Sequence, residues 1–331
     1  MNPKVIGALL SGAVVLALLP VLQLPTFYET LLYLMFHWIV LAVSWNILSG
    51  YSGYFSFGHG AFYGVGVYTT AVLAGTYDWP FLATLPFAAL MAALFGVSLG
   101  AVVFRVKRLR GELFALLTLA ITFVVSMVIL NTPIDGGPGI YLSNVEVPHW
   151  YGSPASTFYL LALLLAVGTL IIAYAIYSGK LGLGLFAIHD DEDVAEVQGV
   201  QTYRYKLLAL GLSCGLAGLA GGVQALFVSY VTVAEIFNMV VPLYVMLMSV
   251  LGGVRHWIGP AVGAVFITAL LYSFTSGDMA VAGRALVGLS LIGVILFMPM
   301  GIVGQWVARR RRLGAVAALP KSAAPLPIAP S

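Results

Sequence analysis

The sequence predicts an all-α polytopic membrane protein with about ten transmembrane helices. Hydrophobic residues make up 61% of the 331 residues and charged residues 8%, with a mean hydropathy of +1.02, whereas soluble domains carry about 25% charged residues. Nine runs of at least 19 residues contain no Asp, Glu, Lys or Arg: 5–28, 30–77, 79–104, 113–134, 147–179, 207–234, 236–254, 256–277 and 285–308. Each is long enough to cross a bilayer, and lipid forces the backbone to pair within a helix.

The run 30–77 is 48 residues long and has room for two crossings. The predicted spans are 5–24, 27–48, 56–74, 80–104, 112–131, 157–177, 207–230, 239–252, 259–275 and 285–306. They form one transmembrane domain over residues 1–307. Residues 308–331 are a basic, then Pro/Ala-rich tail, which we expect to be disordered, with Arg309–Arg312 against anionic membrane lipid.

The basic residues predict the orientation of the spans. With both termini in the cytoplasm, 14 of the 15 Lys and Arg residues fall on the cytoplasmic side and only Arg284 falls outside. The positive-inside rule expects this asymmetry. The loop 132–156 is then outside and the loop 178–206 is cytoplasmic.

The segment 50–70 is too rich in Gly and polar residues for a plain lipid-facing helix. It predicts a broken or re-entrant helix inside the bundle, because irregular backbone at membrane depth must line protein or a cavity. The candidate path residues here are Ser56, Gly58, His59 and Gly64. For His59, a structural role beside a neighbouring side chain is an equal alternative.

The span 112–131 carries a stripe of hydroxyl groups. Thr118, Thr122 and Ser126 repeat every four residues and therefore share one helix face. Such a stripe is consistent with the lining of a hydrophilic path. The more common alternative is that each hydroxyl bonds a carbonyl of its own helix.

The cytoplasmic loop 178–206 predicts a short helix near residues 190–199. Asp190 is a suitable N-cap, Asp191, Glu192 and Asp193 fill the first turn, and Gly199 suits the position after the C-cap. A helix on a membrane surface is usually basic. The acidic character of this one favours a protein partner, with an ordinary surface helix as the alternative.

The sequence lacks the residues that several classes of protein need for their activity. There is no Gly-x-x-x-x-Gly-Lys-[Ser/Thr] loop for ATP, and no nucleophile, metal or acid–base cluster for an intramembrane enzyme. The single Cys214 excludes an intrachain disulfide. No charged residue is predicted in mid-span, which argues against the alternative of a self-sufficient secondary transporter or channel. No cofactor, metal or nucleic acid is expected.

Motifs along residues 30–306 resemble the permease subunits of branched-chain amino acid ABC importers, specifically the M-type subunit of Liv systems, with urea importers as close relatives. The matching residues are Gly53, Ser56, Gly58, His59, Ala61, Phe62, Gly64, Gly66 and Tyr68; the segment 111–120; Ala195, Glu196 and Gly199; the segment 204–209; Ser213 and the segment 217–221; and Gly252-Gly253, Gly259-Pro260, Phe297, Pro299 and Gly301.

The resemblance implies a multi-pass permease in the bacterial plasma (inner) membrane that performs no chemistry itself. Its partners would be a second permease subunit, two ATP-binding subunits and an extracytoplasmic solute-binding protein. The helix near 190–199 would be the coupling helix, with Ala195 and Glu196 among its residues. The cargo would be a branched-chain or other amino acid, urea or another amide, or a small carboxylate.

Overall fold

The computed structural model describes residues 3–22, 25–106, 110–135, 137–273, 288, 289, 293, 301–307 and 309. The α-helices are α1 Pro3–Ala17, α2 Thr26–Ser52, α3 His59–Gly75, α4 Phe81–Val103, α5 Glu112–Leu130, α6 Pro154–Ser178, α7 Lys180–Asp190, α8 Glu192–Val197, α9 Thr202–Val228, α10 Val233–Ile236, α11 Val240–Gly252 and α12 Gly259–Ser273. Two 3-10 turns are η1 Leu19–Leu22 and η2 Trp150–Gly152.

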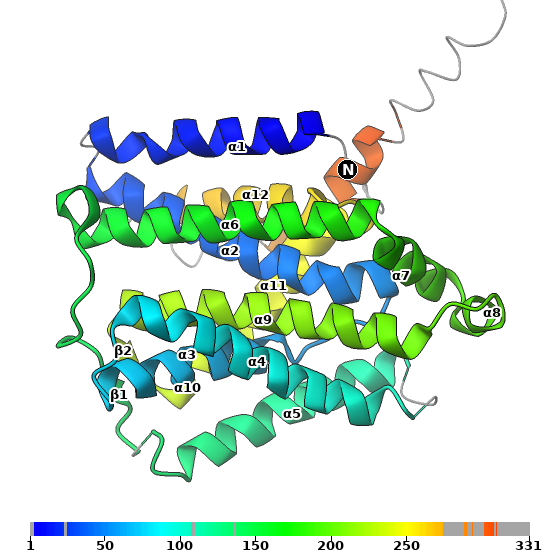
Figure 1. The fold of residues 1–331 in the computed structure, drawn as a ribbon, viewed down its shortest axis with the longest axis horizontal. Helices are drawn as coiled ribbons and strands as arrows, with labels where there is room; N and C mark the ends of the chain where they lie inside the picture. The colour runs from blue at the N-terminus through cyan, green and yellow to red at the C-terminus, as the bar shows by residue number, and fades with distance from the viewer. Residues whose placement is uncertain are drawn as a thin grey trace, which may run out of the picture.

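The long helices lie side by side along one direction and form a bundle (Figure 1). At one end, β1 Ile140–Tyr141 pairs antiparallel with β2 Tyr230–Val231, with Ile140 opposite Val231. At the other end, α8 projects beyond the bundle (Figure 1). We call these the β end and the α8 end.

A polytopic membrane protein is confirmed. In the described residues seven helical segments are long and apolar enough to cross a membrane, and Gly259–Tyr272 is a shorter apolar helix. The seven segments are Pro3–Leu22, Thr26–Ser52, Phe81–Val103, Glu112–Leu130, Pro154–Ser178, Thr202–Val228 and Val233–Gly252. Of the other predicted spans, 56–74 is the 17-residue helix α3 preceded by non-helical chain, and most of 285–306 lies outside the described residues.

Helix α9 lies in the middle of the bundle and packs against α2, α3 and α4. Small residues allow this close packing, because a Cβ at Gly66 would overlap the backbone of Gly218. A Cβ at Gly218 would in turn lie 2.6 Å from the carbonyl oxygen of Ala88 on α4. Apolar side chains gain nothing by leaving lipid for a neighbouring helix, so close backbone approach and dispersion stabilise such a bundle.

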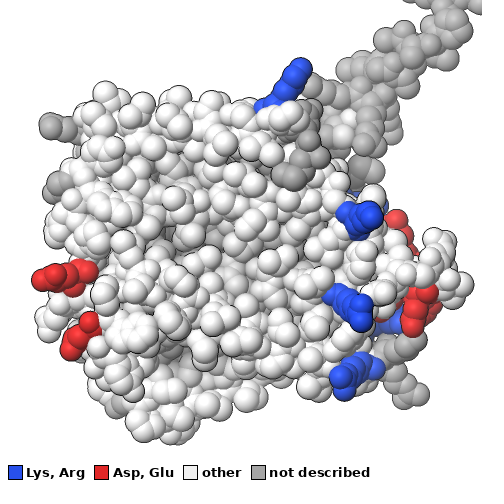
Figure 2. Space-filling view, viewed as in Figure 1, with Lys and Arg blue, Asp and Glu red and all other residues white. Residues whose placement is uncertain are grey.

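Charged side chains gather at the two ends of the bundle, with an uncharged band between them (Figure 2). On the visible face, Lys and Arg lie toward the α8 end and only acidic side chains mark the β end. The sorting of charge seen along the sequence is thus also a sorting in space.

The loop 178–206 contains more helix than the sequence predicts. Residues Lys180–Asp190 form α7, which the sequence does not predict because Gly182 and Gly184 lower its helix propensity. Both glycines are buried, and a Cβ at Gly184 would overlap the ring of Tyr205 on α9. Packing against α9 therefore outweighs the weak local preference.

Candidate functional site

The chain reverses direction immediately after α2. Gly53 has a φ of +75°, in the left-handed region that favours glycine, and its N–H closes the helix on the carbonyl of Ser49. Residues 54–56 have no regular secondary structure, and 57–58 form a bend and a turn. Helix α2 therefore ends at Ser52, and α3 begins only at His59.

Hydrogen bonds hold this reversed segment, residues 53–59, against the last turns of α2. The amide of Ser56 donates to Ser49 Oγ at 3.2 Å, and Trp45 Nε1 donates to the Ser56 carbonyl at 2.7 Å. The ring of His59 lies 2.9 Å from Ser44 Oγ. Since Ser44 and Ser52 are eight residues apart, the segment runs back along roughly 12 Å of helix.

Helix α5 meets the reversed segment at Thr118. The amide of Phe57 donates to Thr118 Oγ1 at 3.1 Å, and a Cβ at Gly58 would lie 3.0 Å from the Thr118 side chain and carbonyl. The structure thus brings Ser56, Gly58 and Thr118 together. The Thr118 hydroxyl also donates to the Ala115 carbonyl.

The other predicted path residues lie apart from this junction. The hydroxyls of Thr122 and Ser126 bond carbonyls of their own helix, at Thr118 and Phe123. Gly64 faces α10, where an added Cβ would lie 2.5 Å from the ring of Phe237. His59 is buried against α2. Three of the seven predicted path residues therefore meet at one packed junction, and the other four pack against neighbouring elements or bond their own helix.

Helix α8 is a short helix with defined ends, although its N-cap differs from the prediction. Asp191, one residue after the predicted Asp190, is extended and accepts a hydrogen bond from the Val194 amide at 3.0 Å. Asp190 instead ends α7 and pairs with Arg255 at 2.6 Å. Gly199 follows the C-cap with a φ of +89°.

One side of α8 faces the bundle and the other faces outward. Ala195 is buried at 2% exposure, while Val194 is 50% exposed and Val197 is 89% exposed. A nearly fully exposed Val at the tip of a projecting helix is available to a partner. Glu196 borders a small hollow between α8, α9 and residues 104–106.

A buried ion network ties α8 to the reversed segment. The Lys206 ammonium contacts Glu192 Oε1 at 2.6 Å, and Lys206 is only 3% exposed. The Tyr54 hydroxyl donates to the same carboxylate, and Lys206 also donates to Tyr54 Oη at 3.1 Å. Glu192 thus joins α8, α9 and the reversed segment.

Arg110 extends the network toward helix α5. Its Nε lies 3.3 Å from Glu192 Oε2, and its two terminal nitrogens each donate to Asp193 at 2.9 Å. Hydrogen bonding to Asp193 and the nearby carboxylates raise the pKa of Arg110, so it stays charged. The sequence does not predict Tyr54, Arg110 or Lys206 as site residues. Only their contacts with residues far away in the sequence identify them, and no local pattern contains that information.

A second contact joins the loop 178–206 to the reversed segment. A Cβ at Gly53 would lie 2.8 Å from Nδ1 of His189, so α7 packs directly on the turn that ends α2. Burial and the nearby Arg255 lower the pKa of His189 and keep the ring neutral near pH 7. Movement of α7 and α8 would therefore reach residues 53–54 by two routes.

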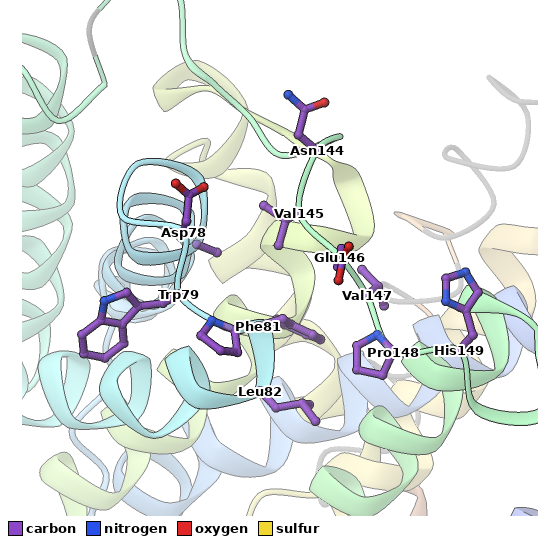
Figure 3. Close-up of a pocket in the computed structure, with 12 residues that line it drawn as sticks. Asp78, Trp79, Phe81, Leu82, Asn144, Val145, Glu146, Val147, Pro148 and His149 are labelled. Atoms are coloured by element: carbon purple, nitrogen blue, oxygen red, sulfur yellow. The ribbon is translucent and has the colours of Figure 1, made fainter.

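The β end carries a broad cavity of about 890 Å³. Figure 3 shows it between the turn 78–82, which joins α3 to α4, and the segment 144–149. The side chains of Asp78, Glu146 and His149 give it a polar rim, and Phe81 and Val147 give it an apolar floor. No predicted site residue lines it.

No group of three or more His, Cys, Asp or Glu side chains suited to a metal ion occurs in the described ranges.

The described residues form a helical bundle with an exposed, anchored helix at one end. The family model for the permease component of branched-chain amino acid transport systems matches residues 27–299. The chain belongs to this family. It is therefore a transport subunit and not an enzyme.

Similar curated proteins agree with this assignment. The high-affinity branched-chain amino acid transport system permease protein LivM of Escherichia coli is 31% identical over 80% of this chain and 67% of its own length. LivM of Salmonella typhimurium is 30% identical over the same shares. A probable LivH permease of Methanocaldococcus jannaschii is 28% identical over 48% of this chain and 50% of its own. No solved structure matches the chain.

Proposed function

We propose that this chain is one of two permease subunits in an ABC importer that carries small amino acids, with branched-chain amino acids as the first candidates. Two ATP-binding subunits would supply the energy, and an extracytoplasmic binding protein would deliver the solute. The observation that carries the proposal is α8, which projects from the bundle and is tied to the reversed segment through the buried Glu192–Lys206 pair.

In this proposal α8 is the coupling helix and docks on an ATP-binding subunit. Its outward residues Val194 and Val197 offer an apolar contact, and its N-terminal acidic residues offer charge complementarity. A shift of α8 on ATP binding would pull on Glu192 and therefore on Tyr54. Tyr54 and Lys206 would then act as positioning residues that transmit the movement.

The α8 end would be cytoplasmic, with the N-terminus on the same side. The basic asymmetry of the sequence supports this orientation. The visible Lys and Arg side chains also lie toward that end of the bundle (Figure 2). The β end, with its cavity of about 890 Å³, would then face the binding protein.

The reversed segment and the Thr118 face of α5 would border the solute path. The non-helical segment 53–58 beside roughly the last 12 Å of α2 would make the third crossing a broken one, with irregular backbone followed by α3. Such backbone is tolerated at membrane depth only where protein or a cavity surrounds it. The path would open where this chain meets the second permease.

The proposal is tested in proteoliposomes that hold the purified four-subunit complex with its binding protein and solute. Val197→Asp places a charge on the tip of α8 and touches nothing in the bundle, since Val197 is 89% exposed. We expect binding-protein-stimulated ATPase activity and uptake to fall together by at least tenfold at unchanged complex yield. The isosteric Val197→Thr is the control and should stay within about twofold.

Two outcomes would contradict the proposal. Full stimulated ATPase activity in the Val197→Asp complex would show that α8 does not dock. Solute uptake by this chain alone, with no ATP-binding subunit present, would instead indicate a self-sufficient secondary transporter or channel.

A further inference from the structure

A small cavity of about 180 Å³ lies between α2, α3, α9, α10 and α11. It is next to the predicted path residue Gly64, because Tyr63 lines it and Gly64 faces Phe237 at the end of α10. Pockets for drug-sized ligands measure about 300–1,000 Å³. This cavity is smaller and suits a solute of a few heavy atoms.

Three polar side chains that line this cavity have no hydrogen-bond partner among the described residues. They are the imidazole of His37, the hydroxyl of Tyr63 and the carboxylate of Glu235. His37 is 6% exposed and Tyr63 4% exposed. Glu235 is exposed and stands at the edge of the cavity. The polar atoms of all three side chains can therefore bond a molecule that occupies the cavity.

Glu235 is the third residue of the candidate span Val233–Gly252 and supplies the carboxylate of this cavity. The sequence predicts a loop at residue 235, before the span 239–252, whereas the structure has the helical turn α10 there. The turn α10 places the exposed Glu235 at the same cavity as Tyr63, close enough for the two side chains to interact electrostatically.

Other groups keep the cavity in shape. Asn238 accepts a hydrogen bond from the Val240 amide at 2.9 Å and donates to the Glu235 carbonyl at 2.7 Å. Gln224 accepts a hydrogen bond from the Tyr33 hydroxyl at 2.7 Å. The rings of His37 and Tyr63 meet edge to face at 5.9 Å. The polar wall is therefore fixed before any ligand arrives.

The chemistry of the walls selects the ligand. Glu235 supplies a negative charge, and no described Lys or Arg lines the cavity to neutralise it. Trp38 and Tyr63 add aromatic rings, which attract cations. The remaining walls are aliphatic: Leu34, Val228, Ile236 and Val241. This combination fits a primary ammonium group joined to a short hydrocarbon side chain.

We infer that this cavity is a transient binding site for the ammonium end of an amino acid cargo, with Glu235 as its acceptor and Tyr63 and His37 completing the hydrogen bonds. The inference rests on the proposed function, because it needs solute to pass through this subunit. It adds a site in α2, α3 and α10 that is separate from the junction of the reversed segment with Thr118.

The test uses the same four-subunit proteoliposomes with L-leucine as the probe. Glu235→Gln keeps the size of the side chain and removes its charge. We expect leucine uptake to fall at least tenfold while binding-protein-stimulated ATPase activity stays within about twofold of the parental complex. Glu112→Gln removes the same charge from an exposed position in the first turn of α5 and is the matched control.

A second variant tests the site if the complex that carries Glu235→Gln does not assemble. Tyr63→Phe removes only the hydroxyl from the cavity and should raise the half-saturating leucine concentration at least threefold at unchanged yield. Parental uptake in either assembled variant would overturn the site. If the parental complex itself takes up no leucine, the proposed function fails, and this outcome is distinct from failure of the cavity.

Discussion

The buried ion pair beneath α8 allows a quantitative prediction. The variant is Glu192→Gln, which removes the charge that faces Lys206 at 2.6 Å. Breaking a buried ion pair by removing one partner costs about 3–5 kcal/mol. Glutamine keeps one acceptor oxygen for Lys206 or Tyr54, and one hydrogen bond contributes about 1 kcal/mol. We therefore expect the attachment of α8 to weaken by about 2–4 kcal/mol.

Amide hydrogen exchange measures this loss where it occurs. The backbone amides of residues 194–200 donate within and just after α8, for example Ala195 to Asp191 and Val200 to Ala195. Every 1.4 kcal/mol changes an opening equilibrium tenfold, so their exchange should accelerate by roughly 30- to 700-fold. Amides of α9 distant from Lys206 should keep their parental rates.

The neighbouring carboxylate provides the matched control. Asp193 pairs with Arg110 at 2.9 Å, but its side chain is 70% exposed. An exposed pair contributes at most about 1 kcal/mol, so Asp193→Asn should accelerate exchange by less than tenfold. The double variant Glu192→Gln/Lys206→Met leaves no charge of the pair buried and should recover part of the protection. Parental exchange in Glu192→Gln, or an equal effect of Asp193→Asn, would refute the role assigned to the buried pair.

Two further predictions concern the orientation and the path. On a Cys214→Ser background, Val197→Cys should react with a membrane-impermeant thiol reagent only from the cytoplasmic side and Asn144→Cys only from outside; the reverse pattern would overturn the orientation. Thr118→Val removes the acceptor of the Phe57 amide and should lower thermal stability by about 1–2 kcal/mol together with maximal uptake, measured against complex yield. Ser126→Ala, whose hydroxyl bonds only its own helix, should change neither; equal effects of the two variants would show that the hydroxyl stripe serves packing alone.

The crossing helices were predictable because their signal is local. The predicted spans 27–48, 80–104, 112–131, 157–177 and 207–230 coincide with α2, α4, α5, α6 and α9 to within about five residues. Length and hydropathy identify such helices with no knowledge of their neighbours. The short capped helix near 190–199 was predictable for the same reason, although its N-cap is Asp191.

The broken crossing was predicted only in outline. Glycine and polar residues at 50–70 indicated irregular backbone, and Gly53 was available for the left-handed turn. The course of the reversed segment depends on Trp45, Ser49 and Thr118, which lie on two other parts of the chain. No periodicity in residues 50–70 contains that information.

What the sequence by itself determined is the membrane bundle, the sorting of its charges and the presence of a short helix in the loop 178–206. Only the tertiary structure decided which polar groups act together. Tyr54 and Glu192 are 138 positions apart and meet at one carboxylate, while Glu235 on α10 and Tyr63 on α3 line the same cavity. Hydropathy is summed residue by residue along the chain, whereas an ion pair or a binding cavity exists only between segments that packing brings together.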